Sequence, residues 1–85
     1  MVNWAKLPVG SSFSAHYHET MQEIFIITKG KVKIIVDGKA YILQEKDLIV
    51  ADPKEIHEMQ NIDRQDVEYL VFGISQGIEG RTVVE

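Results

Sequence analysis

The chain has 85 residues, no cysteine and a formal net charge of −4, with 45% apolar and 26% charged residues. We expect one globular domain, 1–85, without disulfide bonds or cysteine-ligated zinc. An acidic chain is a poor partner for nucleic acid. The longest apolar run is far below the roughly 20 residues of a membrane span. No signal-peptide pattern follows Met1, so we expect a cytoplasmic protein without a membrane partner.

The first segments read as strands. Residues 1–10 are expected to form an entry strand that packs Trp4 and Leu7 on the core and ends near Pro8. Residues 12–19 alternate between two faces, as a half-buried strand does.

This second strand carries two of the three histidines of the chain. Alternate residues share a face, so His16 and His18 point the same way and Phe13 points the other way. Glu23 follows five positions after His18 and opens an apolar run. Two imidazoles joined by a carboxylate from the next strand are ligands that suit a divalent metal.

The rest of the chain continues in short strands. Asp37-Gly38 is typical of a two-residue type I′ hairpin turn, and no apolar pattern of helical period extends beyond one turn. Seven to nine strands with turns at short intervals predict an antiparallel sandwich or barrel. The further strands are expected at 23–28, 31–36, 39–43, 48–51, 56–62 and 67–74, with a possible final strand at 82–84.

Three of these strands are apolar on both faces, in residues 24–27, 48–51 and 69–72. The outer face of an isolated two-sheet barrel should be polar. A domain this small also buries only about 60% of its unfolded surface. We therefore expect a homodimer in which a second subunit covers one sheet. A terminal segment folded over that sheet is the alternative.

The spacing of the histidines resembles the first motif of the cupin superfamily. That motif is Gly, five residues, His, one residue, His, three or four residues, Glu, six residues, Gly. Gly10, His16, His18, Glu23 and Gly30 meet every position and spacing.

The second cupin motif is met in part. It reads Gly, five residues, Pro, one residue, Gly, two residues, His, three residues, Asn. His57 and Asn61 match, whereas Lys46, Asp52 and Lys54 stand where the motif has Gly, Pro and Gly. These departures concern the geometry of the turns more than the histidine.

The resemblance implies an all-β fold: an antiparallel double-stranded β-helix, or jelly-roll barrel, with essentially no helix. It also implies one divalent transition metal per chain, Mn, Fe, Ni, Co, Cu or Zn, inside the barrel. The implied ligands are His16, His18, Glu23 and His57. All three histidines of the chain fall on these positions. A metal-free barrel with a hydrogen-bonded His/Glu cluster is the alternative.

Other side chains on these strands are candidates for the pocket wall. Three apolar residues share the parity of the ligands and are expected to line the pocket, with plain core packing as the alternative: Phe25, Ile27 and Met59. Tyr41 and Tyr69 could each offer a phenol to a ligand, although strand tyrosines more often only pack. No basic residue has inward parity near the histidines, which disfavours a phosphorylated substrate.

The ligand set leaves open positions on an octahedral ion, and three classes of function fit it. The first is a metal-dependent enzyme on a small organic substrate: a dioxygenase, or a sugar or keto-acid isomerase or decarboxylase, with Glu23 as ligand or base. The second is a non-catalytic module that binds a sugar-like metabolite and holds a structural metal. The third is a metal-free barrel. A metal-binding cupin of unassigned activity ranks first, and an oxygenase-type activity next.

Overall fold

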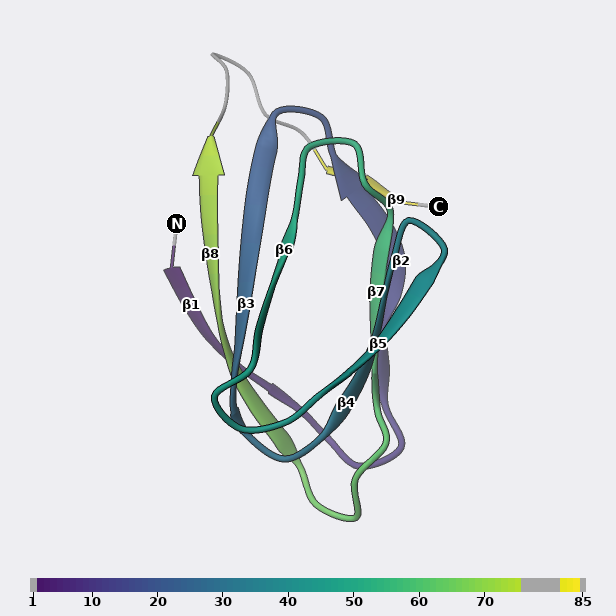
Figure 1. Ribbon diagram of the computed structural model, residues 1–85, viewed down its shortest axis with the longest axis vertical. Coiled ribbons are helices and arrows are strands. Elements are labelled where there is room, and N and C mark those ends of the chain that lie inside the picture. Colours follow the sequence, from purple (N-terminus) through teal and green to yellow (C-terminus); the bar gives the residue numbers. More distant parts are fainter. Residues whose placement is uncertain (1, 76–81, 85) are drawn as a thin grey trace.

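The computed structural model describes residues 2–75 and 82–84, and in these ranges it has nine strands and no helix (Figure 1). Each strand lies where it was predicted, and nearly all bounds lie within two residues of the predicted ones; β3, for example, begins two residues before and ends one residue after the predicted 23–28. Their bounds are β1 Val2–Leu7, β2 Ser12–His18, β3 Met21–Lys29, β4 Val32–Val36, β5 Lys39–Leu43, β6 Leu48–Ala51, β7 His57–Asn61, β8 Val67–Ser75 and β9 Thr82–Val84. No part of the described chain forms a helix capable of crossing a membrane.

The strands form two antiparallel sheets that face each other (Figure 1). One sheet has four strands in the order β1-β8-β3-β6, and the other has five in the order β5-β4-β7-β2-β9. Neighbours in a sheet are mostly distant in sequence, so the chain crosses repeatedly from one sheet to the other. The predicted all-β antiparallel jelly roll is therefore confirmed.

The core lies between the sheets, and alternate residues of the strands point into it. In β4, for example, Val32 and Ile34 are completely buried, while Lys33 between them is not. The buried apolar residues are Leu7, Phe25, Ile27, Val32, Ile34, Val36, Leu43, Ala51, Met59, Val67, Tyr69 and Val71.

The entry strand β1 places its two large apolar residues on opposite faces. Leu7 joins the core as predicted. Trp4 does not: it is 63% exposed on the outer face, and its indole Nε1 donates a hydrogen bond of 3.3 Å to the Glu68 carboxylate. The prediction for Trp4 was wrong because Leu7 lies three positions after it, and residues an odd number of positions apart point to opposite faces of a strand.

Strand β2 contains a bulge that changes its alternation. Phe13 pairs with Met59 and His16 pairs with His57, and the register shifts between these two pairs. Phe13 therefore points inward with His16, and it packs against the core. The prediction that Phe13 faces away from His16 was wrong, because an extra residue in a strand reverses the parity after it.

Two lysines at the turns adopt a left-handed backbone. Lys46 has φ of 74° and Lys54 has φ of 70°, although each stands where the cupin motif has glycine. Both lysines therefore adopt a backbone conformation that glycine adopts more easily. At the β4–β5 hairpin, Asp37 and Gly38 have φ of 51° and 84°, which agrees with the predicted type I′ turn.

Candidate metal centre

Four residues of three strands converge at one end of the barrel. His16 and His18 lie near the end of β2, Glu23 lies near the start of β3, and His57 begins β7. A short turn joins β2 to β3, and β7 runs antiparallel to β2, so these positions lie at the same end. Each residue offers one ligand atom, and these atoms all lie within 4.8 Å of one another. We refer to these four residues as the His–Glu cluster.

One carboxylate oxygen is the centre of the cluster. Oε1 of Glu23 lies 2.7 Å from Nε2 of His18 and 2.8 Å from Nε2 of His57. Nε2 of His16 lies 4.0 Å from the same oxygen. Ligands held about 2.1 Å from a common ion lie roughly 3 to 4 Å from one another, so Nε2 of His18 and His57 would need to move only a few tenths of an ångström from Oε1 to hold a metal.

The backbone determines the tautomer of two imidazoles. Nδ1 of His16 lies 2.8 Å from the carbonyl oxygen of Ser14, and Nδ1 of His57 lies 3.1 Å from that of Glu55. A carbonyl oxygen only accepts, so each Nδ1 carries the proton and donates it. In the neutral ring, Nε2 then presents its lone pair to the interior, as metal-bound histidines do.

The cluster therefore needs a positive charge at its centre. The lone pair of a neutral His57 Nε2, 2.8 Å from the Glu23 carboxylate, would face another lone pair. Either a proton or a metal ion relieves this repulsion. Burial by itself raises the pKa of Glu23, but the hydrogen bond with His57 and the charges of His18 and His57 outweigh it and leave that pKa lowered. The donor set thus fits a divalent cation.

Aromatic rings form one wall of the cluster. The ring centroid of Phe13 lies 5.2 Å from that of His16, and Phe25 lies 5.5 Å from His57. Apolar walls exclude water and strengthen the electrostatic interactions that they enclose. Sequence reasoning missed Phe13, because only the bulge in β2 turns it inward.

The predicted pocket-lining residues are all buried. Phe25 is 3% exposed beside His57, and Ile27 and Met59 are completely buried deeper in the core. Whether these three contact a bound ligand stays a prediction.

Tyr69 is a buried tyrosine of the barrel interior that does not belong to the His–Glu cluster. It is 9% exposed, its ring centroid lies 6.1 Å from that of Phe25, and within the described chain its hydroxyl makes no hydrogen bond. Burial and then the negative charge of Glu23 raise the pKa of this phenol. The hydroxyl therefore stays protonated and can donate a hydrogen bond. Tyr41, in contrast, is 37% exposed on β5, and Lys39 Nζ lies 5.5 Å from its ring centroid.

Asn61 of the second motif holds the loop beyond β7. Its amide nitrogen donates to the carbonyl oxygens of Leu7 and Gln65, and its side-chain oxygen accepts from the amide of Asp63. An asparagine at this position is expected from the sequence to satisfy backbone groups of the following turn, and these hydrogen bonds confirm that expectation. Its role in the structure is to connect β1 with this loop.

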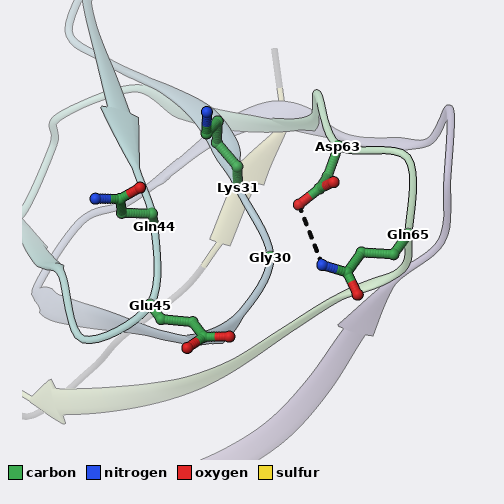
Figure 2. Close-up of a pocket in the computed structure, with 6 residues that line it drawn as sticks. All are labelled: Gly30, Lys31, Gln44, Glu45, Asp63 and Gln65. Atoms are coloured by element: carbon green, nitrogen blue, oxygen red, sulfur yellow. Dashed lines mark hydrogen bonds between the residues drawn. The ribbon is translucent and has the colours of Figure 1, made fainter.

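A separate polar pocket of about 380 Å³ lies at the opposite end of the barrel, beyond the end of β3 (Figure 2). On one side of this pocket, Gln65 donates a weak hydrogen bond of 3.5 Å to Asp63. No member of the His–Glu cluster lines this pocket. Its lining residues are Gly30, Lys31, Gln44, Glu45, Asp63 and Gln65.

Residues 3–73 match the family model described as Cupin domain. The chain belongs to the cupin family. The cupin motif positions Gly10, His16, His18, Glu23 and Gly30 are thus those of a true member, in which the His–Glu cluster could hold a metal ion.

Two curated relatives are similar to this cupin in sequence. One is the "Oxalate-binding protein" of Thermotoga maritima, 35% identical over 65 residues, which are 76% of this chain and 54% of the relative. The other is an uncharacterized protein of Methanocaldococcus jannaschii, 32% identical over 66 residues, which are 78% of this chain and 53% of the relative. The chain thus spans about half the length of both.

Solved structures show the same fold. A predicted oxalate decarboxylase from Thermotoga maritima has a TM-score of 0.85 and 32% identity, over 88% of this chain and 65% of that one. A cupin protein from Bacteroides fragilis has a TM-score of 0.82 and 27% identity, over 94% of this chain and 70% of that one. An oxalate oxidase in complex with glycolate shares the fold at 17% identity, with a TM-score of 0.82 over 94% of this chain and 44% of that one.

Proposed function

We propose that this cupin binds one divalent transition metal through His16, His18, Glu23 and His57 and, on that metal, a small oxygen-donor anion of the oxalate class. One observation supports the metal above all others. Three imidazole nitrogens face a single buried carboxylate oxygen, and two of the rings are held by backbone carbonyls in the tautomer that a metal ligand requires.

The metal would supply the positive charge that the ligand meets. Within residues 2–75 every lysine and arginine lies outside the buried core. No lysine or arginine of this range is therefore placed to bind an anion inside the barrel in place of the metal. Tyr69 offers a protonated hydroxyl to a ligand that extends beyond the metal. Similarity to an oxalate-binding protein and to a predicted oxalate decarboxylase supports a small carboxylate as the ligand.

The chemistry of the interior favours binding over turnover. General acid–base catalysis uses a group that can both take and give a proton near neutral pH. Glu23 has a lowered pKa and is the proposed metal ligand, so it is poorly suited to give a proton. The pKa of Tyr69 is raised, so its hydroxyl is poorly suited to lose one. A metal-dependent decarboxylase or oxygenase, with Glu23 as base, is the second candidate. Its support is the similarity to the predicted oxalate decarboxylase.

Metal analysis and calorimetry test the metal site. The purified chain, stripped with a chelator and titrated with Mn, Fe, Co, Ni, Cu and Zn, is expected to take up about one ion per chain. Glu23→Gln should weaken the affinity at least about tenfold, since it removes a charged ligand. Glu45→Gln, an exposed glutamate at the other end of the barrel, is the matched control. A folded wild-type chain that takes up none of these metals refutes the proposal.

Oxalate titration tests the ligand. We expect oxalate to bind the metal-loaded chain and not the stripped one. Equal binding to both forms would contradict a ligand held on the metal. Formate, carbon dioxide and dissolved oxygen are then measured with the loaded protein and oxalate in air. Turnover supports the enzyme, and binding without turnover supports the binding module.

A further inference from the structure

The loop between β6 and β7, residues 52–56, joins the two sheets at the end of the barrel that carries the His–Glu cluster (Figure 1). β6 ends at Ala51, which pairs with Glu23 in the four-stranded sheet, and β7 begins at His57 in the five-stranded sheet. Glu23 therefore belongs to one sheet and the three histidines belong to the other. The position of this loop thus affects how the carboxylate and the imidazoles face one another.

The loop lacks two residues that restrict the backbone in the second cupin motif. Asp52 stands where the motif has proline, and Lys54 stands where it has glycine. Proline would fix the φ angle of the loop, and glycine would adopt the φ of 70° at Lys54 more easily than lysine does. Other contacts must therefore hold the loop in this chain.

Two reciprocal hydrogen bonds close the loop on itself. The backbone amide of Asp52 donates to Oε1 of Glu55 at 2.7 Å, and the amide of Glu55 donates to the carbonyl oxygen of Asp52 at 3.1 Å. The first of these bonds needs an amide hydrogen at position 52, which a proline does not have. The departure from the motif at Asp52 thus provides the donor that the Glu55 side chain accepts from.

Two further hydrogen bonds attach the loop to the strands of the cluster. The side-chain amide of Gln22 donates to Oδ1 of Asp52 at 2.8 Å, and the backbone amide of Lys54 donates to the carbonyl oxygen of His18 at 2.6 Å. Gln22 directly precedes Glu23 on β3, and His18 is itself a member of the cluster. The loop is thereby bonded to one cluster-bearing strand of each sheet.

The loop also contains the backbone group that orients His57. The carbonyl oxygen of Glu55 lies 3.1 Å from Nδ1 of His57 and accepts its proton. His57 is 1% exposed, so water has little access to replace this acceptor if the loop moves. Glu55 therefore has two roles, because its side chain closes the loop and its carbonyl holds the imidazole.

We propose that Gln22, Asp52 and Glu55 are positioning residues for His57, and we call these three residues the loop clamp. Their hydrogen bonds keep the Glu55 carbonyl beside Nδ1 of His57, so that Nε2 of this ring faces Glu23. The effect of the loop clamp on metal binding rests on the proposed function. Its effect on the His57 proton is independent of any metal, so the two can fail separately.

NMR of the metal-free chain tests the loop clamp directly. The proton on Nδ1 of His57 is expected to exchange slowly with water in the wild type, because it is buried and hydrogen-bonded. Glu55→Ala and Gln22→Ala should each speed up this exchange about three- to tenfold, as expected for the loss of one hydrogen bond. His16 is an internal control, because its Nδ1 donates to Ser14 outside the loop and its exchange should not change.

Further variants separate the hydrogen bond from the charge. Glu55→Gln removes the charge but keeps an acceptor oxygen, so its His57 exchange should stay within about twofold of the wild type. Asp52→Pro removes the donor, so Glu55→Ala should have no further effect in that background. Glu58→Ala, next to His57 but on the side of β7 away from the core, is the matched control. Circular dichroism checks that each variant is folded.

Calorimetry with zinc and cobalt measures the consequence for the metal. Glu55→Ala should weaken the affinity about three- to tenfold, less than the roughly 10- to 100-fold for removal of a group that directly holds a metal ligand. It should also change the visible absorption of bound cobalt, whereas Glu55→Gln and Glu58→Ala should keep both properties.

Three results overturn the proposal. They are unchanged His57 exchange in Glu55→Ala and Gln22→Ala, equal acceleration at His16, and a Glu55→Gln variant that behaves as Glu55→Ala. A chain that takes up no metal, but whose His57 exchange alone responds to these variants, supports the loop clamp and refutes the proposed metal site.

Discussion

Two glycines of the first cupin motif allow a sharp test of how the barrel is closed. Gly30 and Gly10 both have a left-handed backbone, with φ of 91° and 75°. A Cβ on Gly30 would lie 2.8 Å from Cγ2 and 3.3 Å from Cα of Val67, whereas a Cβ on Gly10 would meet no atom within 4 Å. Val67 is completely buried, so it has little room to move.

Alanine at each position should therefore have a different cost. Gly10→Ala should lower the free energy of unfolding by about 1–2 kcal/mol, the cost of a left-handed backbone at a residue with a Cβ. Gly30→Ala should lower the free energy of unfolding by the same amount and by about 1–3 kcal/mol more, because its Cβ overpacks against Val67. Urea denaturation of the metal-free chain at one protein concentration measures both variants.

The expected difference between the variants comes from the Val67 contact alone. A second change, Val67→Ala, removes the Cγ2 atom, so in that background the extra cost of Gly30→Ala should fall. Equal losses for Gly10→Ala and Gly30→Ala would refute this reasoning. The metal affinity of folded Gly30→Ala should stay at the wild-type value, because Gly30 and the His–Glu cluster lie at opposite ends of the barrel.

Three further predictions concern the loop, the pocket and pH. Lys54→Gly should raise the free energy of unfolding by about 1 kcal/mol in urea denaturation, because it relieves a left-handed lysine; a loss would show that the lysine side chain matters. Tyr69→Phe should weaken oxalate binding about two- to tenfold in calorimetry, as expected for one hydrogen bond, and leave the metal content unchanged; unaltered oxalate affinity would exclude contact with the hydroxyl. The lowered pKa of Glu23 should stabilise the metal-free chain above pH 4.5 and lose this effect as pH falls through the folded value. Unfolding of wild type and Glu23→Gln from about pH 6 to about pH 3 measures it, and a difference that grows on acidification contradicts it.

Much of the fold and of the candidate site is local information. The Asp37-Gly38 pair predicts its hairpin because few other residues accept two left-handed positions in succession. The parity of His16, His18 and Glu23, with His57 on a later strand, predicts a common location once the sheet closes. The structure brings these four together, and whether they hold a metal stays a prediction.

Bulges and long-range pairings lie beyond sequence patterns. Phe13 faces the cluster only because β2 gains a residue between its pairs with Met59 and His57. The carbonyls of Ser14 and Glu55 orient two imidazoles, and backbone groups carry no signature in the side-chain pattern. Neither feature can be derived from residue types and spacing.

The sequence by itself determined the β-strands and their turns, since these depend on spacing along a few neighbouring residues, and its resemblance to the cupin motifs implied the four residues of the His–Glu cluster. It also showed that some strands are apolar on both sides. Tertiary structure decided which of these sides stays exposed, because only the pairing of β1, β8, β3 and β6 aligns Trp4, Leu70, Ile26 and Leu48 in one row. A surface made of residues from four distant segments exists only after the chain has folded.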